Sequence, residues 1–327
     1  MSDNSGEINP NVAECPAPLS YQKLKAEALR LGFSAFGAAR TEPVDATNET
    51  AFLAWLGKGR QAGMEYMAGH LDKRLNPQLL FPEGRSILSV ALNYYPARRL
   101  SADQLQFAYY AYGQDYHEVM KTRLRQLALL LGDIPHKICC DTVPILDRYW
   151  AWRAGLGWIG KNTNLIIPHA GSYFFLGEII VAADIDYYDE PLASHCGRCQ
   201  RCLDACPAGA LAAPCQLDAS RCLSYLTIEN RGALPGESAA LMGRGVYGCD
   251  RCQQACPYNR FASPTAIEEF RPTDEFMQMT PDDWANLTIE QYRKLFKGSA
   301  VKRAKYEGLM RNIRAVNGDG SKEESRP

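Results

Sequence analysis

The sequence predicts an α+β protein built from three successive parts, and the spacing of apolar residues and of cysteines gives the evidence. Up to about residue 190, predicted strands and helices are mixed, as in an α/β sheet domain. Residues 191–260 are rich in cysteine, glycine and proline. From residue 261 the apolar residues recur at helical spacing, which indicates a short helical C-terminal region.

The boundaries predicted from these changes are an N-terminal arm at 1–19, a sheet domain at 20–190, a cysteine-rich module at 191–260 and a helical region at 261–327. The arm holds three prolines among polar residues, so we interpret it as flexible. A first helix is expected from Ser20, a suitable cap, to Gly32, a suitable end. A second helix is expected to begin near Phe52.

Three buried strands and a longer helix complete the predicted sheet domain. Continuous apolar runs bounded by turn residues favour strands over 86–95, 136–143 and 173–184. The apolar face of residues 115–131 favours a helix that ends at Gly132. In the C-terminal region, Pro281 is expected to start a helix.

The composition excludes some classes of function. The chain has 327 residues and a net charge of −1, so no overall basic field attracts nucleic acid and any such surface has to be local. We find no secretion signal and no apolar stretch of membrane-spanning length. Twelve cysteines in such a chain indicate a reducing compartment, and we expect a cytoplasmic protein without a membrane segment.

Eight cysteines have the spacing of a bacterial ferredoxin with two 4Fe–4S clusters. The first run is Cys-x-x-Cys-x-x-Cys-x-x-x-Cys-Pro, and Cys222 substitutes for the first cysteine that the second run lacks. In this motif the fourth cysteine of each run ligates the other cluster. The predicted ligands are Cys196, Cys199, Cys202 and Cys256 for one cluster, and Cys206, Cys222, Cys249 and Cys252 for the other.

Zinc sites and disulfides use cysteines differently. Zinc ribbons contain paired Cys-x-x-Cys units, whereas this chain has three cysteines in one run followed by Cys-Pro. Disulfides do not suit a reducing compartment. The spacing therefore favours a carrier of single electrons at low potential. No role is assigned to the remaining cysteines, which are Cys15, Cys139, Cys140 and Cys215.

The glycine-rich stretch at 155–162 is either a ligand-binding loop or a tight turn. Its spacing matches Gly-x-Gly-x-x-Gly, but a dinucleotide site needs a strand before the glycines and a helix after them. The predicted order here is the reverse, which disfavours nicotinamide or flavin binding. Lys161 and Asn162 remain candidates for polar contacts with a ligand.

Asp141 comes just after Cys139-Cys140, near the end of the predicted strand region. It is either a general acid with a pKa raised by burial or a turn-capping residue before Pro144. The segment Asp115-Tyr116-His117 begins like a corrinoid-binding signature of other folds. Met120 replaces the glycine of that signature, so we interpret His117 as a surface residue near a helix start.

Residues 291–314 contain eight basic residues and a single acidic residue, Glu307, with aromatic residues between them. Such a segment either grips a phosphate backbone or forms a solvated helix face. The charge pattern leaves both interpretations open.

From about residue 20 to 316 the chain resembles the epoxyqueuosine reductase family, the cobalamin-dependent iron–sulfur enzymes of queuosine synthesis. The resemblance rests on both cysteine runs and on these segments: Gly113-x-Asp115-Tyr116-His117, Asp141-Thr142-x-Pro144, Ala154-Gly155-Leu156-Gly157-Trp158-x-Gly160-Lys161, Gly171-Ser172-Tyr173-Phe174 and Arg221-Cys222-Leu223-Ser224-Tyr225-Leu226-Thr227.

This resemblance implies a substrate, a cofactor and an acid. The substrate is tRNA with epoxyqueuosine at the wobble position, which is reduced by two electrons to queuosine with loss of water. Residues 20–190 are expected to have a nitroreductase-like or corrinoid-processing-like core that binds cobalamin base-off. The clusters, supplied by an external low-potential donor, are expected to form Co(I), which attacks the epoxide-bearing ring. Asp141 stands at the position of the family's proton donor.

Further contacts follow from the same resemblance. Lys161, Asn162, Asn164 and Ser224 are the expected contacts to cobalamin or substrate. Many members of the family extend into HEAT-like repeats, whereas residues 261–327 provide about one such helix pair for tRNA contact. A monomer is expected. The alternatives are a cobalamin-dependent enzyme similar to reductive dehalogenases, an electron-transfer iron–sulfur protein, and a tRNA-binding protein with structural clusters.

Overall fold

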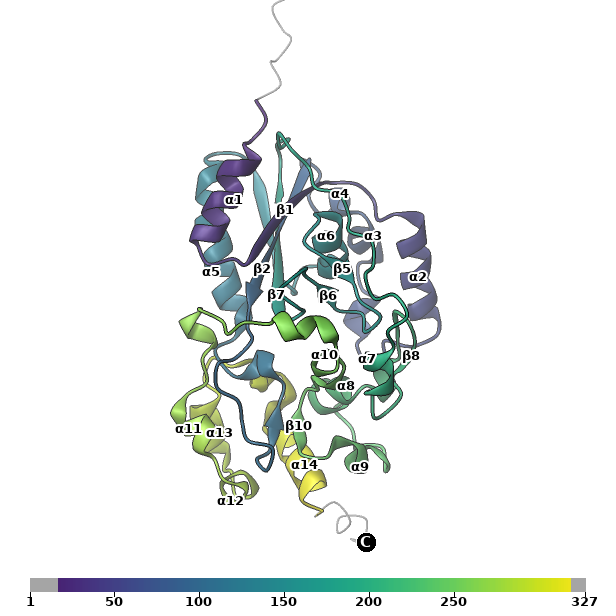
Figure 1. Cartoon of the computed structure of the whole chain (residues 1–327), viewed down its shortest axis with the longest axis vertical. Coiled ribbons are helices and arrows are strands. Elements are labelled where there is room, and N and C mark those ends of the chain that lie inside the picture. Colours follow the sequence, from purple (N-terminus) through teal and green to yellow (C-terminus); the bar gives the residue numbers. More distant parts are fainter. Residues whose placement is uncertain (1–16, 319–327) are drawn as a thin grey trace, which may run out of the picture.

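The computed structural model describes residues 17–318, and at its centre lies a four-stranded antiparallel sheet (Figure 1). The strands follow the order β1 (Ala35–Arg40), β2 (Ser86–Asn93), β7 (Phe174–Val181) and β4 (His136–Cys139). Leu88 pairs with Ala38 on one side and with Ile179 on the other, and Ile179 also pairs with Ile138. The predicted arm falls almost wholly on residues outside the described range.

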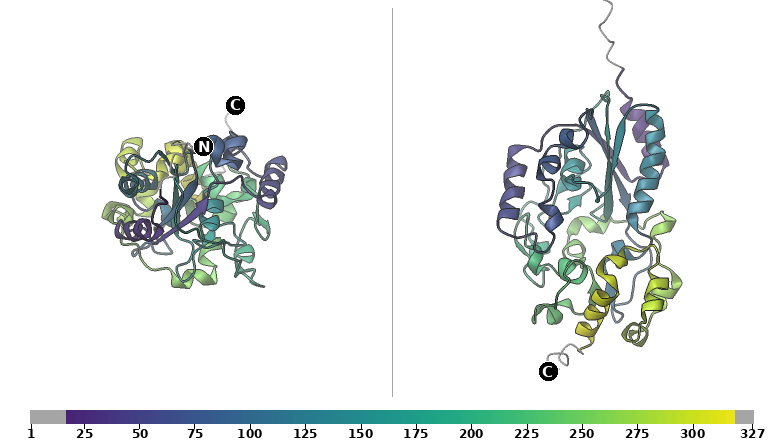
Figure 2. Two further views of the ribbon diagram at one scale, coloured as in Figure 1. Left: turned by 90° about the horizontal axis from the view of Figure 1, so that it is seen from above. Right: turned by 180° about the vertical axis from the view of Figure 1, so that it is seen from behind.

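Helices cover both faces of this sheet, so most positions of β2 and β7 are buried (Figure 2). α1 (Tyr21–Arg30) and α5 (Tyr116–Ala128) pack on the face formed by Leu88, Val90 and Leu92. α6 (Asp147–Arg153) packs on the opposite face, where Trp150 is fully buried against Ile87 and Ala91. The predicted α+β class is confirmed.

Two predicted element bounds shift for local reasons. α2 (Ala46–Gly57) begins before Phe52, because the Asp45 carboxylate accepts hydrogen bonds from the Thr47 and Asn48 N–H groups and caps the helix earlier. β4 ends at Cys139 rather than continuing to residue 143, because Asp141 has a φ of +54° and turns the chain away from the sheet.

The cysteine runs form short helices joined by loops below the sheet (Figure 1). α7 (Arg201–Asp204) lies in the first run, α8 (Leu223–Ile228) follows Cys222, and α10 (Arg251–Gln254) lies in the second run. Between these helices are a hairpin of β8 (Leu211–Ala213) and β9 (Gln216–Leu217), then α9 (Ser238–Met242) and β10 (Gly245–Tyr247).

A buried set of hydrogen bonds joins the second cysteine run to the start of β7. Gln253 Nε2 donates to the Ser172 carbonyl at 3.0 Å, and the Ser172 N–H donates to Asn259 Oδ1 at 2.7 Å. Gly171 has a φ of +88°, and a side chain there would collide with Asn259. The second cysteine run is therefore held at a fixed position beside the sheet.

The C-terminal region consists of α11 (Asp274–Gln278), α12 (Pro281–Ala285), α13 (Ile289–Leu295) and α14 (Lys305–Asn317). α12 starts at Pro281 as predicted, with Thr280 and Asp283 forming a capping box. These helices share an aromatic core with β3 (Gln106–Phe107), which pairs with β10. Residues 100–112 thus pack with the C-terminal helices, although the predicted boundaries group them with the sheet domain.

No helix within residues 17–318 combines the length and the apolar character needed to span a bilayer.

One acidic side chain lies in the middle of the sheet. Glu178 of β7 is fully buried and pairs with Ser89 on one side and Cys139 on the other. Burial raises the pKa of Glu178 well above its ordinary value, and the neighbouring Asp147 raises it further. Glu178 therefore keeps a proton in the folded protein at a pH where the unfolded chain has lost it.

Glutamate in the unfolded chain has a pKa of about 4.3. Above this pH the folded state binds one proton more than the unfolded state, so the free energy of unfolding is expected to fall as the pH rises. We expect Glu178→Gln, which cannot ionise, to weaken this dependence and to be more stable than the wild type at pH 8. Urea unfolding at pH 5 and pH 8 measures this dependence of the free energy of unfolding on pH. The matched control is Glu118→Gln on the exposed side of α5. Parallel pH dependences for wild type and Glu178→Gln contradict the prediction.

Candidate active site

Four cysteines line one small cavity between the two cysteine runs. Cys196, Cys199 and Cys202 come from the first run and Cys256 from the second, and Lys161, Asn162 and Tyr258 complete the wall. Burial raises the pKa of the Cys256 thiol, and the charges of Cys196 and Cys199 raise it further, as expected for thiols that face one another. We call these four residues the first cysteine group.

The other four cysteines lie close enough together for their charges to act on one another. Burial raises the pKa of the Cys252 thiol, and the charges of Cys249, Cys222 and Cys206 raise it further. These four residues are the second cysteine group. Within residues 17–318, no three His, Cys, Asp or Glu side chains are arranged to hold one metal ion. A four-iron cluster spaces its thiolates more widely than a single ion does.

Lys161 and Asn162 contact the cysteine loops. Lys161 Nζ donates to the carbonyls of Gly197 at 2.7 Å and Cys199 at 2.9 Å. Asn162 is 3% exposed, and its Nδ2 donates to the Cys252 carbonyl at 3.4 Å. These bonds favour a role in holding the loops of both cysteine groups.

Asn164 and Ser224 each contact a residue of the cysteine loops or of the loop that supports them. The Asn164 N–H donates to Asn162 Oδ1 at 3.3 Å, and the Ser224 N–H hydrogen-bonds the Cys222 thiol. In the glycine-rich stretch, a side chain at Gly157 would collide with the Ile166 carbonyl. These glycines allow the tight hairpin of β5 (Trp158–Ile159) and β6 (Leu165–Ile166). The glycine-rich stretch therefore forms a tight turn, one of the two structures predicted for it.

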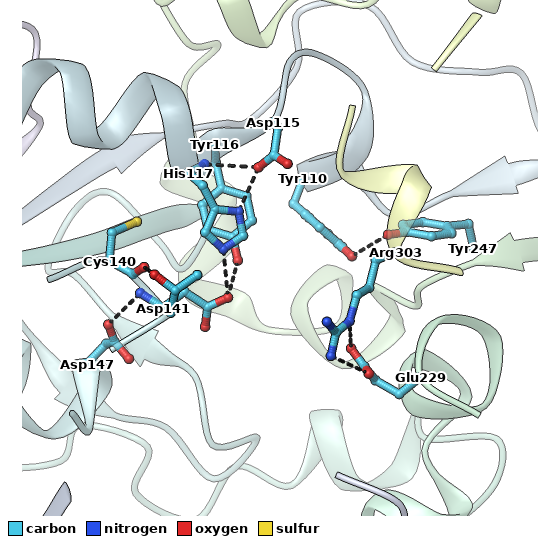
Figure 3. A network of polar contacts seen from close by, with 11 residues as sticks. Tyr110, Asp115, Tyr116, His117, Cys140, Asp141, Asp147, Glu229, Tyr247 and Arg303 are labelled. Carbon is cyan, nitrogen blue, oxygen red and sulfur yellow. Dashed lines mark hydrogen bonds and ion pairs between the residues drawn. The ribbon is translucent and has the colours of Figure 1, made fainter. Parts of the chain in front are cut away.

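Asp141 lies at the centre of a polar network at the end of β4 (Figure 3). Its Oδ2 accepts a hydrogen bond from the Tyr116 hydroxyl at 2.7 Å and lies 3.1 Å from His117 Nε2. The other ring nitrogen of His117, Nδ1, lies 2.7 Å from Asp115 Oδ1. Tyr116 stacks on Phe175 of β7, with ring centroids 4.3 Å apart.

His117 lies at a helix start, as predicted, but it is more than a surface residue, since its half-buried side chain, 24% exposed, contacts Asp141. Asp115 fixes the orientation of the His117 ring toward Asp141. Its carboxylate accepts from the His117 N–H and so caps α5, and it also holds the imidazole ring. The sequence signal for this contact was the Asp-x-His spacing, which identifies the pair but not its distant partner, Asp141.

The network is an ion pair at neutral pH. Burial alone would lower the pKa of His117, but hydrogen bonds to Asp115 and Asp141 outweigh burial and raise it to about 9. The bond from His117 lowers the pKa of Asp141 against the effect of burial, and Tyr116 and Arg148 lower it further. His117 is therefore an imidazolium and Asp141 a carboxylate.

A second acidic residue supports the Asp141 loop from the interior. Asp147 Oδ1 accepts a hydrogen bond from the Asp141 N–H at 3.4 Å (Figure 3). Burial and the charge of Asp141 raise the pKa of Asp147 to about 6. Asp147 thus contacts the backbone of the loop, while the Asp141 carboxylate, 59% exposed, is open to a ligand.

Two of the predicted basic residues are already paired. Arg303 forms a bidentate ion pair with Glu229 at 2.7 and 2.8 Å and lies 5.6 Å above the Tyr66 ring. Arg311 donates to the carbonyls of Leu226 and Asn230, so it joins α14 to α8. Exposed basic side chains in this segment include Arg293, Lys297, Lys302 and Lys305.

The sequence matches two family models. Residues 195–259 match a 4Fe-4S double cluster binding domain, and residues 74–142 match the model described as epoxyqueuosine reductase QueG, DUF1730. The first range contains every residue of both cysteine groups, and the second contains Asp141 and its partners on α5.

Curated relatives cover nearly the whole chain. An epoxyqueuosine reductase of Cellulophaga algicola is 40% identical over 294 residues, which are 89% of this chain and 95% of the relative. An epoxyqueuosine reductase of Escherichia coli K12 is 36% identical over 314 residues, which are 93% of this chain and 82% of the relative.

Solved structures show the same fold. The crystal structure of an epoxyqueuosine reductase with an epoxyqueuosine-modified tRNA-Tyr stem loop has a TM-score of 0.83 at 31% identity, and covers 90% of this chain and 80% of that one. A Bacillus subtilis epoxyqueuosine reductase, with its catalytic aspartate loop swung out of the active site, has a TM-score of 0.82 at 30% identity and the same coverage. This chain belongs to the epoxyqueuosine reductase family.

Proposed function

We propose that this protein reduces epoxyqueuosine to queuosine in tRNA, in the cytoplasm and as a monomer. The observation that carries the proposal is the position of the Asp141 network beside the second cysteine group. The charge of Arg148 acts on both Asp141 and Tyr94, and the charge of Cys252 also acts on Tyr94. Tyr94 in turn accepts a hydrogen bond from Gln253, the neighbour of Cys252. A proton-transfer site thus lies next to a site for electron carriers.

The chemistry of the substrate requires both sites. Conversion of an epoxide to an alkene consumes two electrons and two protons and releases one water molecule. Each 4Fe–4S cluster passes one electron at a time, and an external low-potential donor has to supply the pair. We propose that the two cysteine groups form a path by which these electrons reach the substrate.

The first cysteine group is proposed to ligate one cluster and the second group the other, with the fourth cysteine of each run exchanged. We expect Cys202→Ser and Cys249→Ser each to lose about one cluster, or about four of eight iron atoms, because one thiolate in each group is removed. Iron and sulfide analysis with electron paramagnetic resonance measures this. Cys215→Ser is the control, since Cys215 belongs to neither group. Full iron content in either ligand variant contradicts the assignment.

Two polar residues of the segment 58–75 fit cobalamin, the group that the family implies, bound base-off. Gln61 Oε1 and Arg74 Nε are buried atoms without a hydrogen-bond partner among residues 17–318. The amide side chains around a corrin ring both donate and accept hydrogen bonds, so they suit an acceptor and a donor of this kind. Both atoms lie on the segment 58–75, which contacts the cysteine module through Gly63 and Tyr225. When bound, cobalamin supplies a strongly reducing cobalt centre for the epoxide carbon.

The tRNA is proposed to lie over the rim of the Asp141 site. The charge of Asp141 acts on Arg303 and Tyr66, which we take as this rim. Because Arg303 is already paired with Glu229, the exposed Lys302 and Lys305 beside it in the sequence are the side chains proposed to reach the tRNA backbone. Such side chains suit contacts with phosphate groups, while an aromatic ring suits stacking with a base. Arg311 does not contribute, because its guanidinium group is occupied by main-chain carbonyls.

The decisive experiment is anaerobic reconstitution with iron, sulfide and cobalamin, followed by reaction with epoxyqueuosine-tRNA and a low-potential reductant. Mass spectrometry of the nucleosides is expected to show loss of one oxygen atom from the modified base, and this loss should depend on cobalamin. Unchanged epoxyqueuosine in the presence of both clusters and bound cobalamin overturns the proposed function.

Asp141 is proposed to donate protons to the epoxide oxygen. We expect Asp141→Asn to keep both clusters and bound cobalamin but to lose turnover by about 10²- to 10⁴-fold, the usual contribution of a general acid. Single-turnover rates on the modified tRNA measure the loss. Asp133→Asn, an exposed change on the turn before β4, is the control. A wild-type rate in Asp141→Asn refutes this role.

A further inference from the structure

The proposed reaction raises a question about protons, and the inference drawn here rests on that proposed function. Removal of the epoxide oxygen as water takes two protons, whereas one carboxylic acid donates one proton at a time. In the free protein, Asp141 is a carboxylate and has no proton to give. A neighbouring group therefore has to protonate it.

We propose that His117, held by Asp115, passes protons to Asp141 and so supplies both protons of the reaction. The contacts form a continuous chain, from Asp115 Oδ1 to His117 Nδ1 at 2.7 Å and from His117 Nε2 to Asp141 Oδ2 at 3.1 Å (Figure 3). Both ring nitrogens face carboxylate oxygens, an arrangement that suits an imidazolium, which donates from both.

The other groups that contact the Asp141 carboxylate do not release protons in the neutral range. Burial and the charge of Asp141 raise the pKa of Tyr116 far above its ordinary value, so this hydroxyl keeps its proton and orients the carboxylate. Asp147 reaches the backbone N–H of Asp141 and not its carboxylate.

Charged and titratable groups farther from the carboxylate do not replace His117. The guanidinium groups of Arg74, Arg148 and Arg303 interact electrostatically with the Asp141 carboxylate. Arginine is not deprotonated in proteins, so these groups are not proton donors. Burial raises the pKa of the Tyr66 hydroxyl and of the Cys140 thiol, so neither is an acid at neutral pH. Glu178 is buried in the sheet behind Asp147.

In the proposed reaction two protons and two electrons enter and one water molecule leaves. The proton of His117 moves to Asp141 and then to the epoxide oxygen as the first C–O bond breaks, which leaves a hydroxyl group. The neutral imidazole takes a proton from solvent, which its 24% exposed side chain can reach. This second proton follows the same route to the hydroxyl, which leaves as water when the second C–O bond breaks. The external donor supplies the two electrons through the clusters, and the product contains the C=C bond.

The test compares His117→Gln and Asp115→Asn with the wild type, and uses His136→Gln, an exposed change at the start of β4, as the matched control. Glutamine keeps a hydrogen-bond donor but carries no transferable proton. We expect His117→Gln to lower the single-turnover rate about 100-fold and to remove the decline of the rate above pH 9. Asp115→Asn should move this decline to lower pH, because the imidazolium loses its partner.

A second readout does not depend on activity. In protein without cobalamin, nuclear magnetic resonance of ¹⁵N-labelled histidine is expected to show His117 titrating near pH 9, and at lower pH in both Asp115→Asn and Asp141→Asn. A wild-type rate and pH profile in His117→Gln overturns the inference. So does a titration of His117 that Asp115→Asn leaves unchanged.

These outcomes separate the inference from the proposed function. If the wild-type enzyme forms no queuosine, the proposed function fails, while the titration still reports whether Asp115, His117 and Asp141 act as one unit. If the wild type is active and His117→Gln equals it, the function stands and the inference fails. If His117→Gln does not fold, Asp115→Asn and the titration decide.

Discussion

The buried hydrogen bonds between Ser172 and the pair Gln253 and Asn259 fix the relation between the cysteine module and the sheet. Ser172 and Gln253 are buried, where an unpaired partner costs about 1–3 kcal/mol, so the docking tolerates little displacement. Ser172 lies two residues before β7, the strand that β4 pairs with and α5 packs on. Together with the bonds from Lys161 and Asn162, this contact fixes the cysteine groups beside the strand that also supports Asp141 and His117.

The Asp141 loop combines a strained backbone with several side-chain bonds. A non-glycine residue at a φ of +54° costs about 1–3 kcal/mol, which the bonds from Tyr116, His117 and Asp147 offset. In the Bacillus subtilis relative the catalytic aspartate loop is swung out of the active site, so a loop of this kind occupies more than one position in the family.

The sequence predicts the parts of the protein that local patterns encode. The cysteine spacing led to the same two sets of residues that the structure brings together, and the apolar runs predicted the inner strands. Contacts between distant segments could not be derived in this way. His117 meets Asp141 only because α5 and β4 pack on the same strand, and Arg311 is a structural residue only because α8 presents carbonyls to it.

The charges of the site link electron transfer to proton transfer. At rest, His117 and Asp141 form an ion pair, in which the carboxylate is a weak base because the imidazolium stabilises it. An electron that arrives beside Asp141 adds negative charge, and negative charge raises the affinity of a carboxylate for a proton. In the proposed mechanism, transfer from His117 to Asp141 is therefore favoured once the site is reduced. In this mechanism the proton stays on His117 until reduction of the site raises the proton affinity of Asp141.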